Sequence, residues 1–173
     1  MQAVREGDLG ALAILFERHH RPLFNYFVQV NGNRDLSEDL VQDVFFRMLK
    51  YRQSYKPDRP FTAWMYQIAR NARVDTIRKR KFEVELGDKE FPSASLMDEN
   101  LKRKQELSLL KRAMERLPQE KRELLVLSRF QNLKYEEIAA ILDCSVGAVK
   151  VRVYRAVQSL GQIYSELAGE RAS

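Results

Sequence analysis

The chain has 173 residues, of which 45% are hydrophobic and 31% are charged, and its net charge at pH 7 is +6. This length suits one large domain or two small ones. Its seven Gly, five Pro and single Cys argue against turn-rich β folds, low-complexity chains and disulfide-stapled domains. No apolar stretch approaches the roughly 20 residues that cross a bilayer, and no signal-peptide pattern stands at the N-terminus. The sequence therefore predicts a soluble, cytoplasmic protein without membrane insertion.

The charge is unevenly distributed along the chain. Residues 52–82 carry nine basic and two acidic side chains, and residues 101–173 carry 14 basic and nine acidic ones. Between them, residues 83–100 hold six acidic side chains and one lysine. Two basic blocks separated by an acidic strip predict two modules that bind an anionic partner. The alternative for the run Arg78–Lys81 is a solvated helix end, where cations favour the helix dipole.

Apolar residues recur at three- and four-residue spacing through most of the chain, which predicts helices and no persistent strand. The first helix is expected from Leu9 to residues 31–33, where Asn-Gly-Asn favours a C-cap. Pro22 lies inside this stretch and predicts a kink or a break. A second helix is expected to begin at Ser37, because two acidic residues follow it in the first turn.

A third long helix is expected over residues 61–81, after a loop that holds two prolines. Helical spacing predicts its buried face, namely Phe61, Trp64, Met65, Ile68, Ala72 and Ile77. We interpret Trp64 as a core residue rather than a wedge between DNA bases, because aromatic stripes at this spacing usually mark packing. Residues 87–95 have the composition of a linker. The predicted fold is all-α, with two small helical domains (1–84 and 101–173) joined by a flexible linker (85–100).

Beyond the linker, helices are expected over residues 98–116, 118–131, 135–142 and 146–167. The last two match a helix-turn-helix pattern, since a short apolar helix is followed by a three-residue turn and by Ser145, a favourable N-cap. The expected buried face of the last helix is Val146, Val149, Val153, Val157 and Leu160. The alternative is an ordinary helical hairpin whose exposed face happens to be basic.

The opposite face of the last helix carries residue types that read DNA in the major groove. Gly147 permits close backbone approach, and Lys150 and Arg155 can reach guanine acceptors. Arg152 is placed to contact phosphate. The candidate contacts on this helix are Ser145, Gly147, Lys150, Arg152, Tyr154 and Arg155.

Three segments of the chain, in this order, resemble the extracytoplasmic-function (ECF) group of bacterial sigma-70 factors. Residues 33–45 (NRDLSEDLVQDVF) are similar to the family's core-binding segment, and residues 61–71 (FTAWMYQIARN) to its promoter-melting and minus-ten-reading segment. Residues 135–155 resemble its minus-thirty-five-reading helix-turn-helix. The resemblance implies a protein that is not an enzyme, that gives RNA polymerase core its promoter specificity, and that an anti-sigma factor regulates, in some cases at the inner membrane.

The resemblance also implies where polymerase binds. It places one face of the helix from Ser37 against the β′ clamp coiled coil, and the second domain against the β flap. The face consists of Asp39, Gln42, Asp43 and Phe46. Phe46 is an aromatic on the polar side of an amphipathic helix and favours a partner. The alternative is a lone exposed aromatic, which many protein surfaces carry.

For the minus-ten element, the resemblance places a flipped base at the loop 55–59 and Asn71. Tyr55 would offer a π-face, Asn71 would bond the base edge, and nearby cations would hold the strand. The expected contacts are Tyr55, Lys56, Asp58, Arg59, Arg70, Asn71, Arg73, Arg78 and Arg80. Gln67 and Ile68 stand where primary sigma factors carry melting aromatics, which predicts stricter dependence on promoter sequence.

The sequence predicts no catalytic residue, metal site or cofactor. His19 and His20 are adjacent and lack the i, i+4 spacing of a helical metal pair. Cys144 is expected to be a small buried residue. A different class, a stand-alone helix-turn-helix regulator that never contacts polymerase, fits the second domain as well. Asp39 and Asp43 separate the two hypotheses, because only a sigma factor needs them for core binding.

Overall fold

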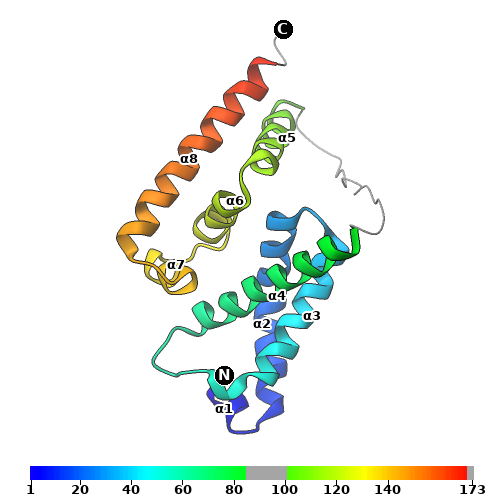
Figure 1. Ribbon diagram of the computed structural model, residues 1–173, viewed down its shortest axis with the longest axis vertical. Coiled ribbons are helices and arrows are strands. Elements are labelled where there is room, and N and C mark those ends of the chain that lie inside the picture. Colours follow the sequence, from blue (N-terminus) through cyan, green and yellow to red (C-terminus); the bar gives the residue numbers. More distant parts are fainter. Residues whose placement is uncertain (85–100, 171–173) are drawn as a thin grey trace. The chain divides into compact units, whose positions relative to one another are not determined.

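The computed structural model describes residues 1–84 and 101–170, with side chains described for residues 1–79 and 105–170. The predicted linker, residues 85–100, lies outside the described residues. All regular secondary structure in the described ranges is helical, and the chain forms two compact units, which confirms the predicted all-α class with two helical domains (Figure 1).

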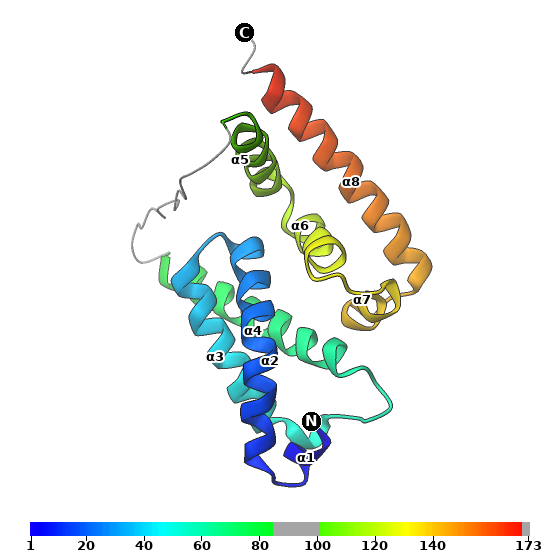
Figure 2. The same cartoon turned by 180° about the vertical axis from the view of Figure 1, so that it is seen from behind.

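The first unit is built on a pair of long helices, α2 and α3, that a third long helix crosses (Figures 1 and 2). Its elements are α1 (Gln2–Arg5), α2 (Leu9–Asn31), α3 (Arg34–Lys50), the 3₁₀ turn η1 (Arg52–Ser54) and α4 (Phe61–Val84). Gly32 ends α2 with φ of 72°, a left-handed conformation that glycine adopts without a steric penalty. This allows the tight connection from α2 to α3.

The sequence predicts a kink or a break at Pro22, but α2 continues through Pro22 without a break, so the second of these alternatives is wrong. A proline removes one backbone donor, but the helix after it is held by a contact face of large buried side chains. That face is Leu23, Tyr26, Phe27 and Val30, each 2% exposed or less. Burial of these large side chains outweighs the cost of the missing hydrogen bond.

The start predicted for α3 is wrong by one turn. The helix begins at Arg34, because the side chain of Asn33 accepts a hydrogen bond from the backbone N–H of Leu36 at 2.8 Å. Ser37 lies inside the helix, completely buried, and its hydroxyl donates to the carbonyl oxygen of Asn33. Both residues are good caps, and the earlier one takes that role.

The core side of α4 contains Met65, Ile68 and Ala72, as predicted, but Ile77 is 38% exposed. The helical period places Thr76, rather than Ile77, one turn beyond Ala72 on the inner side. Trp64 is half-buried, and its ring packs edge-on against that of Tyr55, with centroids 5.3 Å apart.

In the second unit, α8 packs along α5 and α6 (Figures 1 and 2). Its elements are α5 (Leu101–Arg116), α6 (Gln119–Leu125), a π-helical turn η2 (Val126–Phe130), α7 (Tyr135–Leu142) and α8 (Val146–Gly169). On α8 the buried residues are Val149, Val153, Ala156 and Leu167, whereas Val157 is 41% exposed. The prediction for Val157 is wrong because Ala156, seven residues after Val149, stays closer to the centre of the buried stripe.

Candidate polymerase and promoter surfaces

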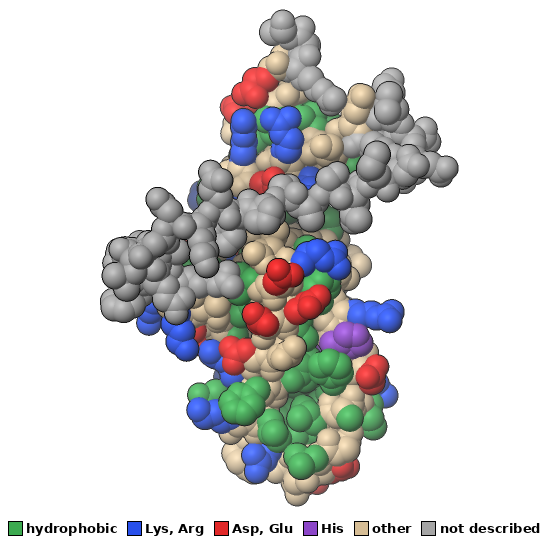
Figure 3. Space-filling model, turned by 90° about the vertical axis from the view of Figure 1, so that its right-hand side faces the viewer, with side chains coloured by type: hydrophobic (Ala, Val, Ile, Leu, Met, Phe, Trp, Pro, Cys, Tyr) green, Lys and Arg blue, Asp and Glu red, His purple; other side chains and the backbone are tan. Residues whose placement is uncertain are grey.

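The outer face of α3 combines acidic side chains with an exposed aromatic ring. Asp39, Gln42 and Phe46 are exposed, and Phe46 keeps 66% of its surface in solvent. These residues recur at three- and four-residue spacing, on the side of α3 opposite its buried residues. Figure 3 shows acidic side chains gathered on the side of the first unit where α2 and α3 lie, with hydrophobic side chains exposed below them. This surface suits a partner that offers both cations and apolar area.

The fourth predicted member of this face, Asp43, is held by an ion-pair network. Arg47 donates from Nε to Asp43 at 2.9 Å and from a terminal nitrogen to Asp75 of α4 at 2.6 Å. Burial alone would lower the pKa of Arg47, but the hydrogen bonds with the two carboxylates raise that pKa above its usual value. Arg47 therefore stays charged and ties α3 to α4 at the edge of the candidate surface.

The loop between η1 and α4 exposes three of its predicted DNA-binding residues. Lys56, Asp58 and Arg59 are all exposed, and the N–H of Arg59 donates to the carbonyl of Lys56 at 3.1 Å. Tyr55 is only 8% exposed, and its ring packs against those of Trp64 and Phe61. The stacking role predicted for Tyr55 does not fit this arrangement, because its buried ring offers no free face to a base.

On α4, the predicted DNA contacts differ in exposure according to helical position. Asn71 and Arg78, seven residues apart, are exposed on the same side, and Arg70 is half-buried. Arg73 is only 4% exposed, which contradicts its predicted contact with phosphate. It lies four residues after the buried Ala69, and so its position on the core side was readable from the spacing. The side chain of Arg80 lies outside the described residues.

The helix-turn-helix has the predicted local geometry at the start of α8. The hydroxyl of Ser145 accepts a hydrogen bond from the N–H of Ala148 at 3.1 Å, which confirms the predicted N-cap. The preceding turn contains Asp143 in the left-handed region, with φ of 49°, and the N–H of Cys144 donates to the carbonyl of Ala139 at 3.0 Å. Cys144 itself is half-buried rather than buried.

The solvent side of α8 presents the predicted contacts together. Exposed there are Ser145, Gly147, Lys150, Val151, Arg152, Tyr154 and Arg155, and Tyr154 is 66% exposed. A Cβ at Gly147 would meet only the hydroxyl of Ser145, at 3.9 Å, so the fold itself does not require glycine there. Arg155 lies nearer the middle of the exposed side than Arg152, which lies at its edge. This fits the predicted division between base and phosphate contacts.

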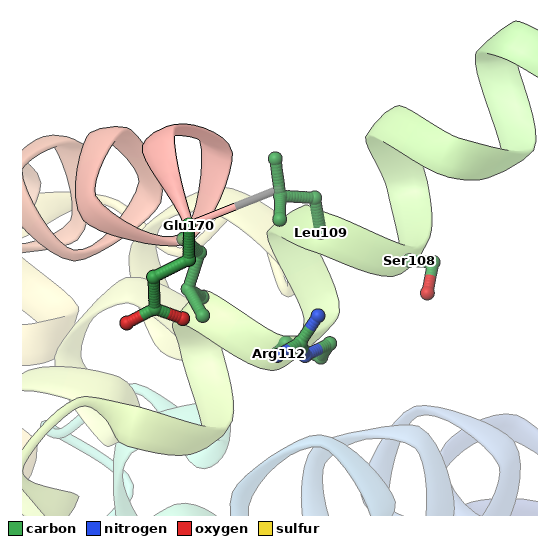
Figure 4. Close-up of a pocket in the computed structure, with 5 residues that line it drawn as sticks. Ser108, Leu109, Arg112 and Glu170 are labelled. Atoms are coloured by element: carbon green, nitrogen blue, oxygen red, sulfur yellow. The ribbon is translucent and has the colours of Figure 1, made fainter. Parts of the chain in front are cut away.

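Other features of the described residues do not add a reactive centre. No group of three or more His, Cys, Asp or Glu side chains in these ranges is placed to hold a metal ion. No described helix is both long and apolar enough to span a bilayer. A shallow cavity of about 260 Å³ in the second unit is lined by Ser108, Leu109, Arg112, Leu167 and Glu170 (Figure 4). It contains none of the predicted site residues.

Comparison with known proteins places both units in one family. Residues 15–83 match Sigma-70 region 2, and residues 107–160 match Sigma-70, region 4. The ECF RNA polymerase sigma factor EcfG of Rhodopseudomonas palustris is 33% identical over 80% of this chain and 76% of its own length. The RNA polymerase sigma factor CarQ of Myxococcus xanthus is 30% identical over 96% of this chain and 97% of its own length.

A solved structure also shares the fold. It is the sigma factor RpoE in complex with the anti-sigma factor NepR from Bartonella quintana, with a TM-score of 0.74 and 26% identity over 91% of this chain and 98% of the matched chain. The chain therefore belongs to the ECF group of the sigma-70 family, as its three motifs predict. It is a transcription initiation factor that binds RNA polymerase core and promoter DNA.

Sequence reasoning missed several contacts within the first unit, and two of them serve as examples. One is the bridge from Arg47 to Asp75, and the other joins Gln53 to Arg5. The partners lie 28 and 48 residues apart in the chain, so no local spacing indicates them. The only available signal was that Arg47 follows Asp43 by one helical turn, the spacing of an i, i+4 ion pair.

Proposed function

We propose that the outer face of α3, made of the exposed Asp39, Gln42 and Phe46 and the half-buried Asp43, binds the coiled coil of the polymerase β′ clamp. The observation that carries this proposal is Phe46, a ring 66% exposed on a helix face that is otherwise polar and acidic. An aromatic ring beside carboxylates suits a partner surface that buries the ring and supplies cations. The second unit, under the same proposal, contacts the β flap.

We infer that the first unit also reads the minus-ten element. Lys56, Asp58 and Arg59 offer exposed polar groups at the loop, and Asn71 offers an exposed amide on α4. An amide can bond the edge of an unstacked base, and cations hold the backbone of a single strand. Tyr55 supports this loop from beneath rather than stacking on a base. Arg70, Arg78 and Arg80 of α4 would hold phosphates.

We propose that α8 enters the major groove of the minus-thirty-five element. Its exposed Lys150 and Arg155 would bond base edges, with Gly147 allowing close approach of the backbone. Arg152 would contact phosphate, and the exposed ring of Tyr154 would lie against the groove wall. In this proposal residues 1–84 carry core binding and minus-ten recognition, residues 101–173 carry minus-thirty-five recognition, and residues 85–100 link them.

We further propose that an anti-sigma factor regulates this chain. The matched RpoE structure is a complex with the anti-sigma factor NepR and aligns with 91% of this chain. The exposed ring and acids of α3 are groups that an inhibitor can cover and so withhold from polymerase. Under this proposal the protein works in the cytoplasm, where polymerase and chromosome are, or at the inner membrane when its anti-sigma factor is anchored there. It catalyses no reaction of its own.

The test is run-off transcription with purified polymerase core and a promoter library. The wild-type chain is expected to give specific transcripts, which also identify the promoter. The variant with Asp39→Ala and Asp43→Ala is expected to give none, because the acidic part of the core surface is lost. A matched control with Glu6→Ala and Glu17→Ala removes the same charge from exposed positions elsewhere in the first unit.

Three readouts decide the proposal. Transcripts that vanish only with the α3 variant support the assigned surface. Equal transcription by both variants would overturn it. Binding of promoter DNA with no transcript from any version, wild type included, would instead favour a DNA-binding regulator that does not use this surface. Thermal unfolding of each variant shows whether a loss of transcription comes from a loss of fold.

A further inference from the structure

The short helix α1 packs against the segment that leads into the candidate minus-ten loop. It contacts both α2 and η1, and Val4 within it is completely buried. Two hydrogen bonds join it to that segment. The side-chain amide of Gln53 donates to the backbone oxygen of Arg5 at 3.0 Å, and the guanidinium of Arg5 donates to the backbone oxygen of Tyr55 at 3.4 Å. Arg5 therefore bonds on both sides of the entry to the loop.

Tyr55 is held from its other side by aromatic rings of α4. Its ring lies edge-on to that of Trp64 at 5.3 Å and to that of Phe61 at 6.3 Å between centroids. The ring of His19 on α2 lies 5.1 Å from that of Phe61 and extends this cluster. Tyr55 is thus fixed through its side chain by α4 and through its backbone by α1.

The four residues after Tyr55 have no such support from the core. Residues 56–59 are all exposed, and one turn hydrogen bond, from the N–H of Arg59 to the carbonyl of Lys56, closes the loop on itself. A loop that binds a strand in one geometry loses less entropy when that geometry exists before binding. The conformation at its entry, Tyr55, therefore determines how residues 56–59 are presented.

We propose that α1 is a brace for the minus-ten loop, with Arg5 and Gln53 as positioning residues that fix Tyr55 and do not themselves contact DNA. This inference rests on the proposed minus-ten role of residues 56–59 and Asn71. When either hydrogen bond is removed, Tyr55 at the loop entry can shift, whereas the helical core stays packed. The effect is confined to minus-ten recognition, because the α3 face and α8 do not depend on this contact.

The test uses the holoenzyme, formed from polymerase core and the full chain, and the promoter identified by run-off transcription. Binding is measured to a fork DNA whose minus-ten bases are single-stranded, and to the same fork with those bases scrambled. Arg5→Ala together with Gln53→Ala is expected to lower discrimination between the two forks about tenfold, as for two lost hydrogen bonds. Gln53→Glu, which loses the donor and keeps the shape, is expected to lose about threefold to fivefold.

The brace also predicts readouts that a general loss of stability does not produce. Hydrogen exchange in residues 54–62 should become faster in the Gln53→Glu variant, with exchange in α2 and α3 unchanged. Core affinity and binding to a minus-thirty-five duplex should stay within about twofold of wild type, a free-energy change below about 0.4 kcal/mol. Arg21→Ala and Asn25→Ala, exposed on α2, are the matched charge and amide controls and should leave discrimination intact.

The variants Lys56→Ala and Asn71→Ala separate the brace from the function on which it rests. If these two lower discrimination and Gln53→Glu does not, the brace is refuted and the minus-ten site stands. If none of them changes discrimination, both are refuted. If Arg5→Ala weakens both forks equally and Gln53→Glu changes nothing, Arg5 is a direct phosphate contact and the brace is refuted.

Discussion

Replacing Phe46 with alanine should weaken polymerase binding strongly while leaving the fold intact. A phenylalanine buries roughly 150–250 Å² when fully covered, and in this chain 66% of Phe46 is still open to solvent. Covering the remaining area, about 130 Å² at about 25 cal/mol per Å², stabilises the complex by about 3 kcal/mol. The Kd for core should therefore rise about 100-fold in the Phe46→Ala variant. Stability should change by less than about 0.5 kcal/mol, because the ring packs little within the folded chain.

The assay is a titration of labelled chain with polymerase core, followed by fluorescence anisotropy. Ile14→Ala is the matched control, since Ile14 is also an exposed apolar residue of the first unit, at 54%. Phe46→Leu should retain most of the affinity, because leucine still fills an apolar pocket. A Kd for Phe46→Ala within about twofold of wild type, in a chain with unchanged thermal unfolding, would show that the ring is not at the interface.

The other predictions concern DNA binding and pH. Arg155→Ala should reduce discrimination between promoter and scrambled duplex by about 1–3 kcal/mol. Arg152→Ala should instead weaken binding to both duplexes equally and flatten the salt dependence of binding. Competition binding across a salt series tests this, and identical effects of the two variants contradict it. Gly147→Ala should fold normally, because its Cβ has space, yet bind the minus-thirty-five duplex more weakly; unchanged affinity refutes close approach there. Burial and the charge of Arg18 lower the pKa of His19 below 6.5 in the folded chain. The imidazole of the unfolded chain therefore takes up a proton at a higher pH than that of the folded chain. As a result, stability falls as the pH drops through 6.5 toward the lowered pKa. Urea unfolding of His19→Gln should show a smaller loss, and an equal loss excludes His19 as the cause.

The class of fold and the identity of the family could be predicted from local patterns alone. Helical spacing, a cap at Ser145 and three ordered motifs are properties of short segments, and a single sequence contains them. Competing caps are harder to resolve: Asn33 and Ser37 both qualify, and the choice between them depends on how deeply α3 is buried. Helical spacing likewise predicts that Val157 is buried, whereas the packing of α8 buries the smaller Ala156.

The site was predicted less completely, because charge and exposure are different properties. Arg73 is as basic as Arg78, yet the first is buried and the second is exposed, since only the helical phase of α4 separates them. The burial of Tyr55 was likewise not evident from its residue type, because an aromatic residue in a loop can pack inward against rings from another element. The partners of Arg5 and Arg47 depend on chain segments that meet only in the folded unit.

Arg47 lies on α3, the helix assigned to polymerase. Its guanidinium also bonds to α4, the helix assigned to promoter DNA. Its two carboxylate partners lie on different helices, so loss of the cation leaves both carboxylates without a counter-charge, whereas loss of one carboxylate leaves a one-to-one ion pair. A substitution at one of these three positions therefore affects which residues are tolerated at the other two as related chains diverge. Across related chains, positions 43, 47 and 75 should covary, and lineages that lose the cation should also lose at least one acid.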